Sequence, residues 1–358
     1  MRRRRDWIVV AIVAVLLAAG VVLAGTLVPG ATGKATAAGS SPSPWPSPSP
    51  GVILQVGHDG TFVKQFTLAD LEALTPFPGA SLPSYAGFMN SGGVVSGPEL
   101  VTGDRVSDIV QAALGTPLTA TQSVAVIGSD GYSQIYTYDQ LVKLIGLSQM
   151  YNANTQKPVS LSSVTGPFAA VLIYSDPGQN VMATADGPLR LVVADATNEP
   201  IVMTGSDSVK WVAKLNVLDS VAKNWSLKLT GLKIKGKRQT RTITRNDFQS
   251  CVNCHGSSYK AAGKTWSGTP LDLFVGEVDG GATMDYNAAL AHKGYRIRLT
   301  STTGKVRYVS SRTIIDKRRI VLAWELNGAV LRNNLFPLRL MGPKLTASQK
   351  LGRIKSVT

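Results

Sequence analysis

Cysteine and histidine are scarce in this chain of 358 residues, which contains two cysteines and three histidines. Both cysteines and one histidine fall within residues 250–256, so any metal or redox cofactor held through sulfur is expected there. The sequence has no Ser/His/Asp set, no phosphate-binding glycine loop and no carboxylate pair at a useful spacing. Basic and aromatic residues do not interleave and no nucleic-acid motif is present, so we expect no nucleic-acid partner.

Acidic residues are few in the second half of the chain. Residues 225–358 carry 24 basic and 7 acidic residues, whereas residues 6–224 carry 9 basic and 15 acidic ones. A positive half of this kind indicates an anionic partner. The candidates are a phosphate-bearing cofactor, a small oxyanion substrate and an acidic cell surface.

The N-terminal residues 1–30 predict a membrane anchor. Arg2 to Arg5 precede Trp7–Leu27, a run of 21 residues without a charged side chain. Such a run is long enough to cross the hydrocarbon core of a bilayer as a helix. The flanking arginines place the N-terminus inside, so we expect a single-pass cell-membrane protein with the bulk of the chain extracytoplasmic. Cleavage after Ala37 would release a secreted protein instead.

Proline and serine dominate residues 31–50. Repeated proline keeps a chain extended and semi-rigid, so we interpret this segment as a linker that holds the folded part away from the membrane. Trp45, the single tryptophan of the segment, could be a contact point, but a solitary tryptophan in a linker is expected to be inert.

From residue 51 onward the same features recur in the same order, which indicates an internal duplication. Each half has an alternating strand, a threonine that caps a short helix, a loop, a glycine turn into a helix, a Gly-Tyr pair, an apolar strand, a Pro-Leu-Arg-Leu segment and a basic closing strand. We predict a first repeat at 51–222 and a second at 223–358. Short strands with few short helices, and without βαβ alternation, predict an α+β fold in which strands dominate.

Three segments of the first repeat carry a family resemblance: Asp130-Gly-Tyr132, Gly187-Pro-Leu-Arg190-Leu and Lys210-Trp211. The second repeat matches at Gly294-Tyr295, Pro337-Leu-Arg339, Lys355 and the turn Trp266-x-Gly268-x-x-Leu271. This pattern resembles the molybdopterin-binding domain of the sulfite oxidase family over roughly residues 51–358. The resemblance implies two tandem molybdopterin-domain folds and a molybdopterin-dependent oxidoreductase.

In that family one cysteine thiolate ligates molybdenum, and basic residues grip the phosphate of the pterin. The resemblance places the metal ligand on Cys251 or Cys254, and the Cys-Val pair favours Cys251. It places the phosphate contacts on Arg339, Lys350, Arg353 and Lys355. The first repeat has no cysteine in the equivalent loop and is expected to be a cofactor-free duplicate. No catalytic residue, substrate or redox partner can be named from the sequence.

Two other interpretations of the cysteine stretch remain open. Cys-x-x-Cys-His is the attachment pattern of c-type haem, with thioether bonds to Cys251 and Cys254 and His255 as an axial iron ligand. The second axial ligand of such an electron-transfer module would be Met284, Met341 or His292. Alternatively, the chain is a non-enzymatic binding or structural protein without a cofactor, in which a Cys251–Cys254 disulfide closes an exported loop.

Overall fold

The computed structural model describes residues 45–358, except 91, 148, 164–165, 183–186, 235–236, 280–285 and 316–319. The predicted anchor at 1–30 and most of the predicted linker at 31–50 lie outside these residues. None of the described helices combines the length and the hydropathy that a bilayer span needs.

Strands dominate the structure, which confirms the predicted α+β class. The first half contains β1 (Val52–His58), β2 (Thr61–Thr67), α1 (Leu68–Glu72), β3 (Ser84–Met89), β4 (Val95–Arg105), α2 (Val106–Leu114), β5 (Ser123–Gly128), β6 (Ser133–Thr137), α3 (Tyr138–Val142), β7 (Met150–Asn152), β8 (Pro158–Val159), η1 (Leu161–Ser163), β9 (Phe168–Ser175), β10 (Arg190–Asp195), β11 (Ile201–Thr204), η3 (Gly205–Asp207) and β12 (Val212–Leu218).

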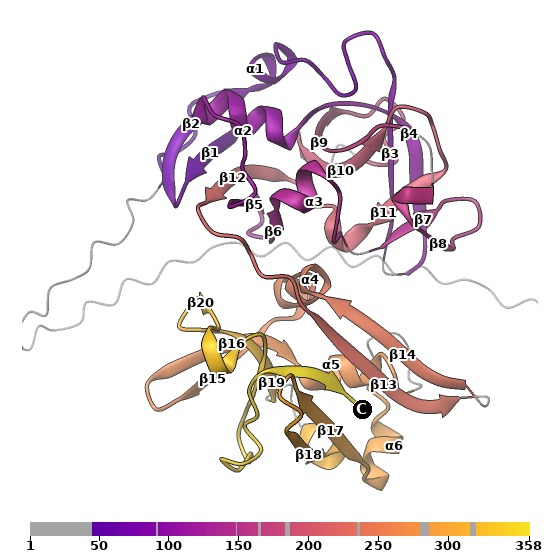
Figure 1. Ribbon diagram of the computed structural model, residues 1–358, viewed down its shortest axis with the longest axis vertical. Coiled ribbons are helices and arrows are strands. Elements are labelled where there is room, and N and C mark those ends of the chain that lie inside the picture. Colours follow the sequence, from indigo (N-terminus) through magenta and orange to yellow (C-terminus); the bar gives the residue numbers. More distant parts are fainter. Residues whose placement is uncertain are drawn as a thin grey trace, which may run out of the picture. The chain divides into compact units, whose positions relative to one another are not determined.

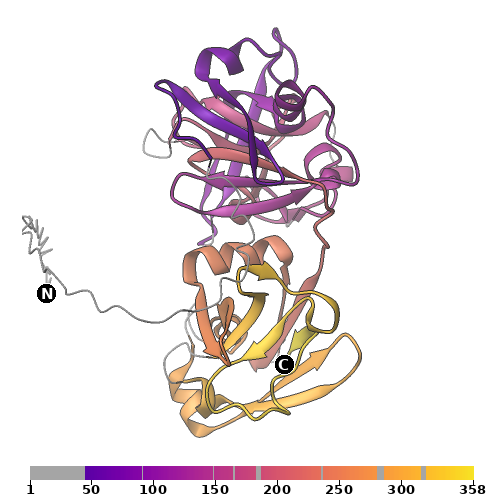
Figure 2. The same ribbon diagram turned by 90° about the vertical axis from the view of Figure 1, so that its left-hand side faces the viewer.

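The second half contains β13 (Ser226–Ile234), β14 (Lys237–Thr244), α4 (Arg245–His255), β15 (Ser257–Ala261), β16 (Lys264–Pro270), α5 (Leu271–Gly276), α6 (Ala288–Lys293), β17 (Arg296–Ser301), β18 (Val306–Ser310), α7 (Ser311–Ile314), β19 (Val321–Leu326), β20 (Ala329–Val330), η4 (Asn333–Leu335), β21 (Arg339–Met341) and β22 (Ile354–Val357). Figures 1 and 2 show the strands of the two halves as separate groups, indigo to rose and orange to yellow.

The two halves share a strand order. The first has a five-stranded sheet in the order β2-β1-β12-β5-β6, and the second has one in the order β14-β13-β22-β17-β18. In each sheet the first strand of the half runs parallel to its last strand. A further sheet completes each half, with β10-β9-β4-β3-β11-β7-β8 in the first and β15-β16-β19-β20, plus β21 beside β19, in the second.

Backbone details recur at the same places. Trp211 and Arg353, which precede the last strand of each half, are both non-glycine residues with positive φ, at 53° and 58°. The backbone hydrogen bonds around them match, because Leu191 and Leu340 donate to the carbonyls of Val209 and Leu351 respectively. By this alignment Arg190 of β10 is the counterpart of Arg339 of β21.

Glycine is required at one position in β4 and one in β16, where each strand lies very close to the backbone of the strand beside it, just before a helix begins. A Cβ atom on Gly103 of β4 would lie 2.3 Å from the carbonyl oxygen of Leu172, and one on Gly268 of β16 would lie 2.0 Å from that of Leu322. Only a residue without a side chain allows these approaches. The predicted glycine turns are therefore close strand contacts that lead into α2 and α5.

The end of the linker packs on the first half. The ring of Trp45 meets Phe62 edge-on at 6.5 Å, and its Nε1 donates to the Gly60 carbonyl at 2.9 Å. The ammonium of Lys214 lies 5.2 Å from the Trp45 ring centre. The interpretation of Trp45 as inert is therefore wrong: it covers part of the sheet that contains β1, β2 and β12.

Candidate functional site

The cysteine stretch forms the second half of helix α4. Its N-terminus is closed by a capping box, in which Asp247 N donates to Thr244 Oγ1 at 3.2 Å and Thr244 N donates to the Asp247 carboxylate at 3.0 Å. The helix ends at His255 and is followed by Gly256, where a Cβ atom would lie 2.3 Å from the Val252 carbonyl oxygen. The capping threonine was predicted correctly, but the expected cysteine loop is wrong, because the helix continues through both cysteines to His255.

The helical spacing places both thiols on one face of α4. Residues three and four apart on a helix are neighbours, so Cys251 and Cys254 are adjacent, with Ser250 and Asp247 on the same side. Cys251 is half-buried, Cys254 is exposed, and both are free thiols. The alternative with a Cys251–Cys254 disulfide is thus not borne out: the two side chains lie one helical turn apart without a bond.

A cavity of about 510 Å³ lies against this face of α4, and we call it the cysteine cavity. Half of its lining comes from each half of the chain. The first half contributes Phe88, Asn90, Asp130, Tyr132, Arg190, Thr204, Gly205, Ser206, Ser208 and Lys210. The second contributes Arg241, Ile243, Asp247, Ser250, Cys251, Cys254, His255, Leu273, Phe274 and Glu277. The first half, which was expected to be a cofactor-free duplicate, therefore supplies half of the residues that line the cavity of the thiols.

Buried hydrogen bonds from α4 hold the two halves together at this cavity. The Arg245 guanidinium donates to the Ile135 carbonyl at 2.6 Å and to Gln140 Oε1 at 3.0 Å. Gln134 Nε2 donates to the Asn246 carbonyl at 2.9 Å. Because β6 is an edge strand, its backbone groups need such partners when they are buried. The polar start of α4 supplies them.

The same turn of α4 contacts η3. Asn246 Nδ2 donates to Asp207 Oδ1 at 2.9 Å, and Ser206 Oγ donates to Asp247 Oδ1 at 2.8 Å. On its other side, the Phe248 ring of α4 stacks on Phe274 at 5.3 Å, within the core of the second half. Helix α4 is therefore fixed from both sides, and its thiols have a defined position in the cavity.

The surroundings of the thiols favour their protonated form. Burial raises the pKa of Cys251 to about 12, and the carboxylates of Asp247 and Glu277 act in the same direction, while Arg241 opposes them. Burial also raises the pKa of Cys254, with a further contribution from Asp130. A coordinated metal would favour a thiolate here, because it stabilises the deprotonated sulfur.

Three cations line the cysteine cavity. The Arg190 guanidinium, which is 4% exposed, lies 3.8 Å from the Phe88 ring centre, and its Nε donates to Ser208 Oγ at 2.8 Å. Lys210 lies over the Trp211 ring at 4.1 Å. The third is Arg241, which forms an ion pair with Glu277.

The formal charges of the lining cancel. Asp130, Asp247 and Glu277 lie in the same lining as the three cations. The large positive charge of the second half is therefore not concentrated at the cysteine cavity.

The predicted phosphate contacts lie elsewhere. Arg339, Lys350, Arg353 and Lys355 do not line the cysteine cavity. Arg339 stacks over Trp266 at 5.2 Å, and burial lowers its pKa. The structure thus does not bring the thiols together with these four side chains, and a role for them in cofactor binding stays a prediction. Arg190, the structural counterpart of Arg339, lines the cavity instead, and the recurring Pro-Leu-Arg-Leu segment was the signal that could have found it.

His255, the axial ligand of the haem interpretation, is among the residues that line the cysteine cavity. Neither Met341 nor His292 lines it, and Met284 lies outside the described residues. The described residues contain one group of possible metal ligands within 4.8 Å of one another, His58, Asp59 and Asp219, which includes neither cysteine.

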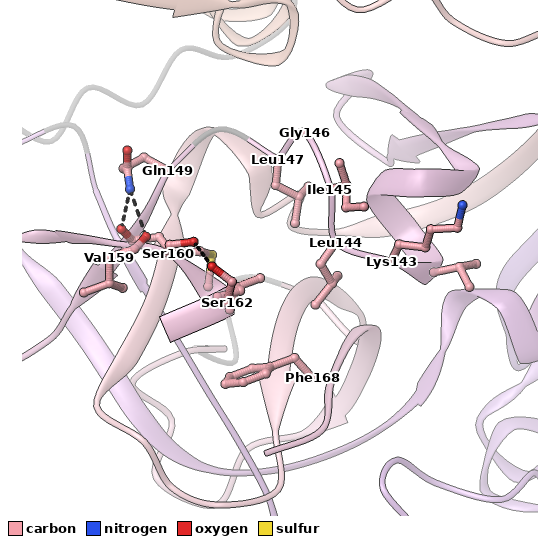
Figure 3. Close-up of a pocket in the computed structure, with 13 residues that line it drawn as sticks. Lys143, Leu144, Ile145, Gly146, Leu147, Gln149, Val159, Ser160, Ser162 and Phe168 are labelled. Carbon is pink, nitrogen blue, oxygen red and sulfur yellow. Dashed lines mark hydrogen bonds between the residues drawn. The ribbon is translucent and has the colours of Figure 1, made fainter. Parts of the chain in front are cut away.

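A second cavity, of about 670 Å³, lies within the first half (Figure 3). Its polar side chains are already engaged: Gln149 Nε2 donates to the Val159 carbonyl at 3.2 Å, Ser160 and Ser162 bond each other at 2.8 Å, and Lys143 pairs with Asp139. Its lining contains no cysteine, histidine or carboxylate among the described residues. Of these two cavities, the cysteine cavity is therefore the one whose lining contains thiols, a histidine and carboxylates.

The sequence matches no protein-family model, and no curated protein matches it. Among solved structures, the sulfane dehydrogenase SoxCD from Paracoccus pantotrophus matches with 15% sequence identity and a TM-score of 0.27. The match covers 37% of this chain and 37% of that chain. A likeness of this degree carries no argument about the activity of the present protein.

The donor set of the cysteine cavity fits a group held through sulfur. One half-buried thiol and a second exposed thiol lie in its lining, which also contains the side chains of Arg190 and Lys210. Soft transition metals prefer thiolate ligands, and phosphate or oxyanion groups prefer arginine and lysine.

Proposed function

We propose that this chain is a redox protein that holds a molybdenum–pterin cofactor in the cysteine cavity, with Cys251 as the metal ligand. The observation that carries the proposal is the place of the Cys251 thiol, on a rigid helix, at the wall of a cavity of about 510 Å³. The resemblance of the two repeats to molybdopterin-binding domains supports the same cofactor class.

Each side chain has a distinct role in this proposal. Cys251 supplies the thiolate, and its raised pKa makes cofactor binding release a proton. Arg190 and Lys210 face the anionic part of the cofactor or an oxyanion substrate. When bound, the cofactor supplies two-electron chemistry at a small polar substrate, and the protein orients it and excludes competing reactions.

We also propose that Trp7–Leu27 anchors the chain in the cell membrane and that the folded part is extracytoplasmic. The uncharged run and the arginines before it support this location. Protease protection of the full chain in intact cells and spheroplasts tests it. A folded part that is cleaved only after cell lysis contradicts the proposed side.

Metal analysis of matched variants tests the cofactor assignment. The full chain is produced in cells that synthesise both the molybdenum cofactor and c-type haem, and molybdenum and released pterin are quantified. The wild type and Cys254→Ser are expected to contain molybdenum in proportion to the chain, whereas Cys251→Ser is expected to lose it. Loss in Cys254→Ser alone moves the ligand to Cys254. A wild type without molybdenum refutes the proposal.

A second candidate is a c-type haem module, because Cys251, Cys254 and His255 all line the same cavity from one helix. In that case the wild type shows a Soret band that survives denaturation. Of the candidates for the second axial ligand, Met341 and His292 do not line the cavity, and Met284 lies outside the described residues. A colourless wild type removes this candidate.

A further inference from the structure

Four of the basic residues of the second half lie on the exposed face of its five-stranded sheet. The inner face of this sheet contributes Leu227, Leu299 and Val357 to the core. The exposed basic side chains of the sheet include Lys228 on β13, Lys355 on β22, and Arg296 and Arg298 on β17. We call these four residues the basic sheet face.

The strand register brings these side chains close together. Lys228 pairs with Ser356 of β22, whose other neighbour is Thr300 of β17. Arg298 lies two residues before Thr300 and therefore on the same face, and its backbone bonds that of Thr358. Lys355 is the extra residue of an irregularity in the pairing of β22 with β17, between the pairs Ser356–Thr300 and Ile354–Ser301, which lets it share the exposed side with Ser356. Figure 1 shows β13, β14, β17 and β18, with β22 ending at the mark C.

Nothing acidic balances this face within the sheet. The strands β13, β14, β17, β18 and β22 contain no aspartate or glutamate. The ion pairs between described residues do not involve any of the four cations. Arg296 instead stacks at 4.0 Å over Tyr308, a side chain that is 42% exposed.

The first half provides an internal control for the fold. Its sheet has the same strand order, yet its strands contain only Lys64 and Lys214 as basic residues apart from His58. Lys214 is stacked against Trp45, and Lys64 donates to the Ala112 carbonyl at 3.1 Å. A sheet with this strand order therefore forms without an array of cations, and folding does not explain the basic sheet face.

The cysteine cavity does not use these cations either. Its lining includes none of the four residues, and its own formal charges cancel. Binding of a cofactor in the cysteine cavity thus does not explain the basic sheet face.

We propose that the basic sheet face docks on the surface of a membrane that contains anionic phospholipids. Charge complementarity supports this partner, because long basic side chains on an open sheet can reach many headgroup phosphates at once. A partly exposed tyrosine beside the arginines suits the boundary between headgroups and water. The sequence before the described residues contains the uncharged run Trp7–Leu27, which would keep this face near a bilayer at high effective concentration.

Lysine footprinting of the full chain in nanodiscs tests the docking. The chain is reconstituted in phosphatidylcholine alone or in phosphatidylcholine mixed with phosphatidylglycerol, so that any anchor is present in both. Acetylation of Lys228 and Lys355 is then followed by mass spectrometry. Both are expected to react about fivefold more slowly in the anionic discs, the factor that corresponds to the attraction of one basic residue to an anionic surface. Acetylation of Lys64 and Lys157, in the first half, is expected to be equal in both discs.

Salt and variants decide whether the protection is electrostatic. At about 1 M NaCl, where the Debye length is about 3 Å, the protection is expected to disappear. The double variant Arg296→Gln with Arg298→Gln is expected to lose it, whereas Arg332→Gln, which removes an exposed arginine outside the sheet, keeps it. The proposal would be overturned if Lys228 and Lys355 were acetylated at the same rate in both kinds of disc, or more slowly in the neutral discs. It would also be overturned if the slower acetylation in the anionic discs survived the double substitution.

Discussion

Replacing Asp104 by asparagine is expected to make the protein less sensitive to alkaline pH. Asp104 lies in β4, is fully buried, and neither of its carboxylate oxygens has a hydrogen-bond partner among the described residues. Burial, and secondarily the charge of Asp108 on α2, raises its pKa from 3.8 to about 7. Tyr174 of β9 is near enough for Asp104 to contribute to its raised pKa of about 12.

The raised pKa of Asp104 determines how the free energy of unfolding changes with pH. The unfolded chain gives up the Asp104 proton near pH 4, whereas the folded chain keeps it until about pH 7. The free energy of unfolding is therefore highest at low pH and falls as the pH rises between these values. A gap of about three pH units corresponds to about 4 kcal/mol above pH 7, of which about 3 kcal/mol is lost between pH 5 and pH 8.

Denaturant unfolding across this pH range measures the effect. The wild type is expected to lose about 3 kcal/mol from pH 5 to pH 8 through this one group, and Asp104→Asn is expected to lack that loss. The equivalent position after Gly268 is Thr269, so Asp104→Thr is a second variant with a residue that the fold already accepts. Asp139→Asn, at an exposed carboxylate paired with Lys143, serves as the control. Equal pH dependence in the wild type and both Asp104 variants would refute the reasoning.

Three further predictions concern the contacts described above. Arg245→Ala removes two charge-assisted hydrogen bonds, one to the Ile135 carbonyl and one to Gln140 Oε1, which keeps its bonds from Thr137. It is expected to lower the free energy of unfolding by about 3 kcal/mol, which denaturant titration would detect. A change below about 0.5 kcal/mol would contradict this expectation. Trp45→Ala removes a packed ring and one hydrogen bond, so its unfolding free energy is expected to fall by about 2 kcal/mol; an unchanged melting temperature would show that the contact adds nothing. In the cofactor-free protein, Cys254 is expected to react with iodoacetamide before Cys251, because Cys254 is exposed and burial raises the pKa of Cys251 to about 12. Mass spectrometry after short labelling shows the order of the two reactions. Faster labelling of Cys251 would contradict the expectation.

Local signals in the sequence predicted much of the architecture. The strand-rich class, the capping residues Thr67 and Thr244, and the glycine before each following helix are all local features, and the structure confirms them. The extent of α4 was missed. Its second half contains serine, asparagine, cysteine and histidine, which favour a helix only weakly by themselves. The packing of Phe248 on Trp225 and Phe274 holds this helix, and that contact is not visible in the local sequence.

The sequence by itself determined the fold class, the capping of α4 and the single place where cysteine ligands can occur. These depend on periodicity and on neighbours along the chain. Only the tertiary structure decided which cations share a cavity with the thiols. Arg190 and Lys210 are separated from Cys251 by many residues, and they line the same cavity because the polar start of α4 binds the edge strand β6. Likewise, strand pairing gathered Lys228 and Arg298 on one face, and an irregularity in the pairing of β22 added Lys355, since residues far apart in sequence become neighbours when their strands pair.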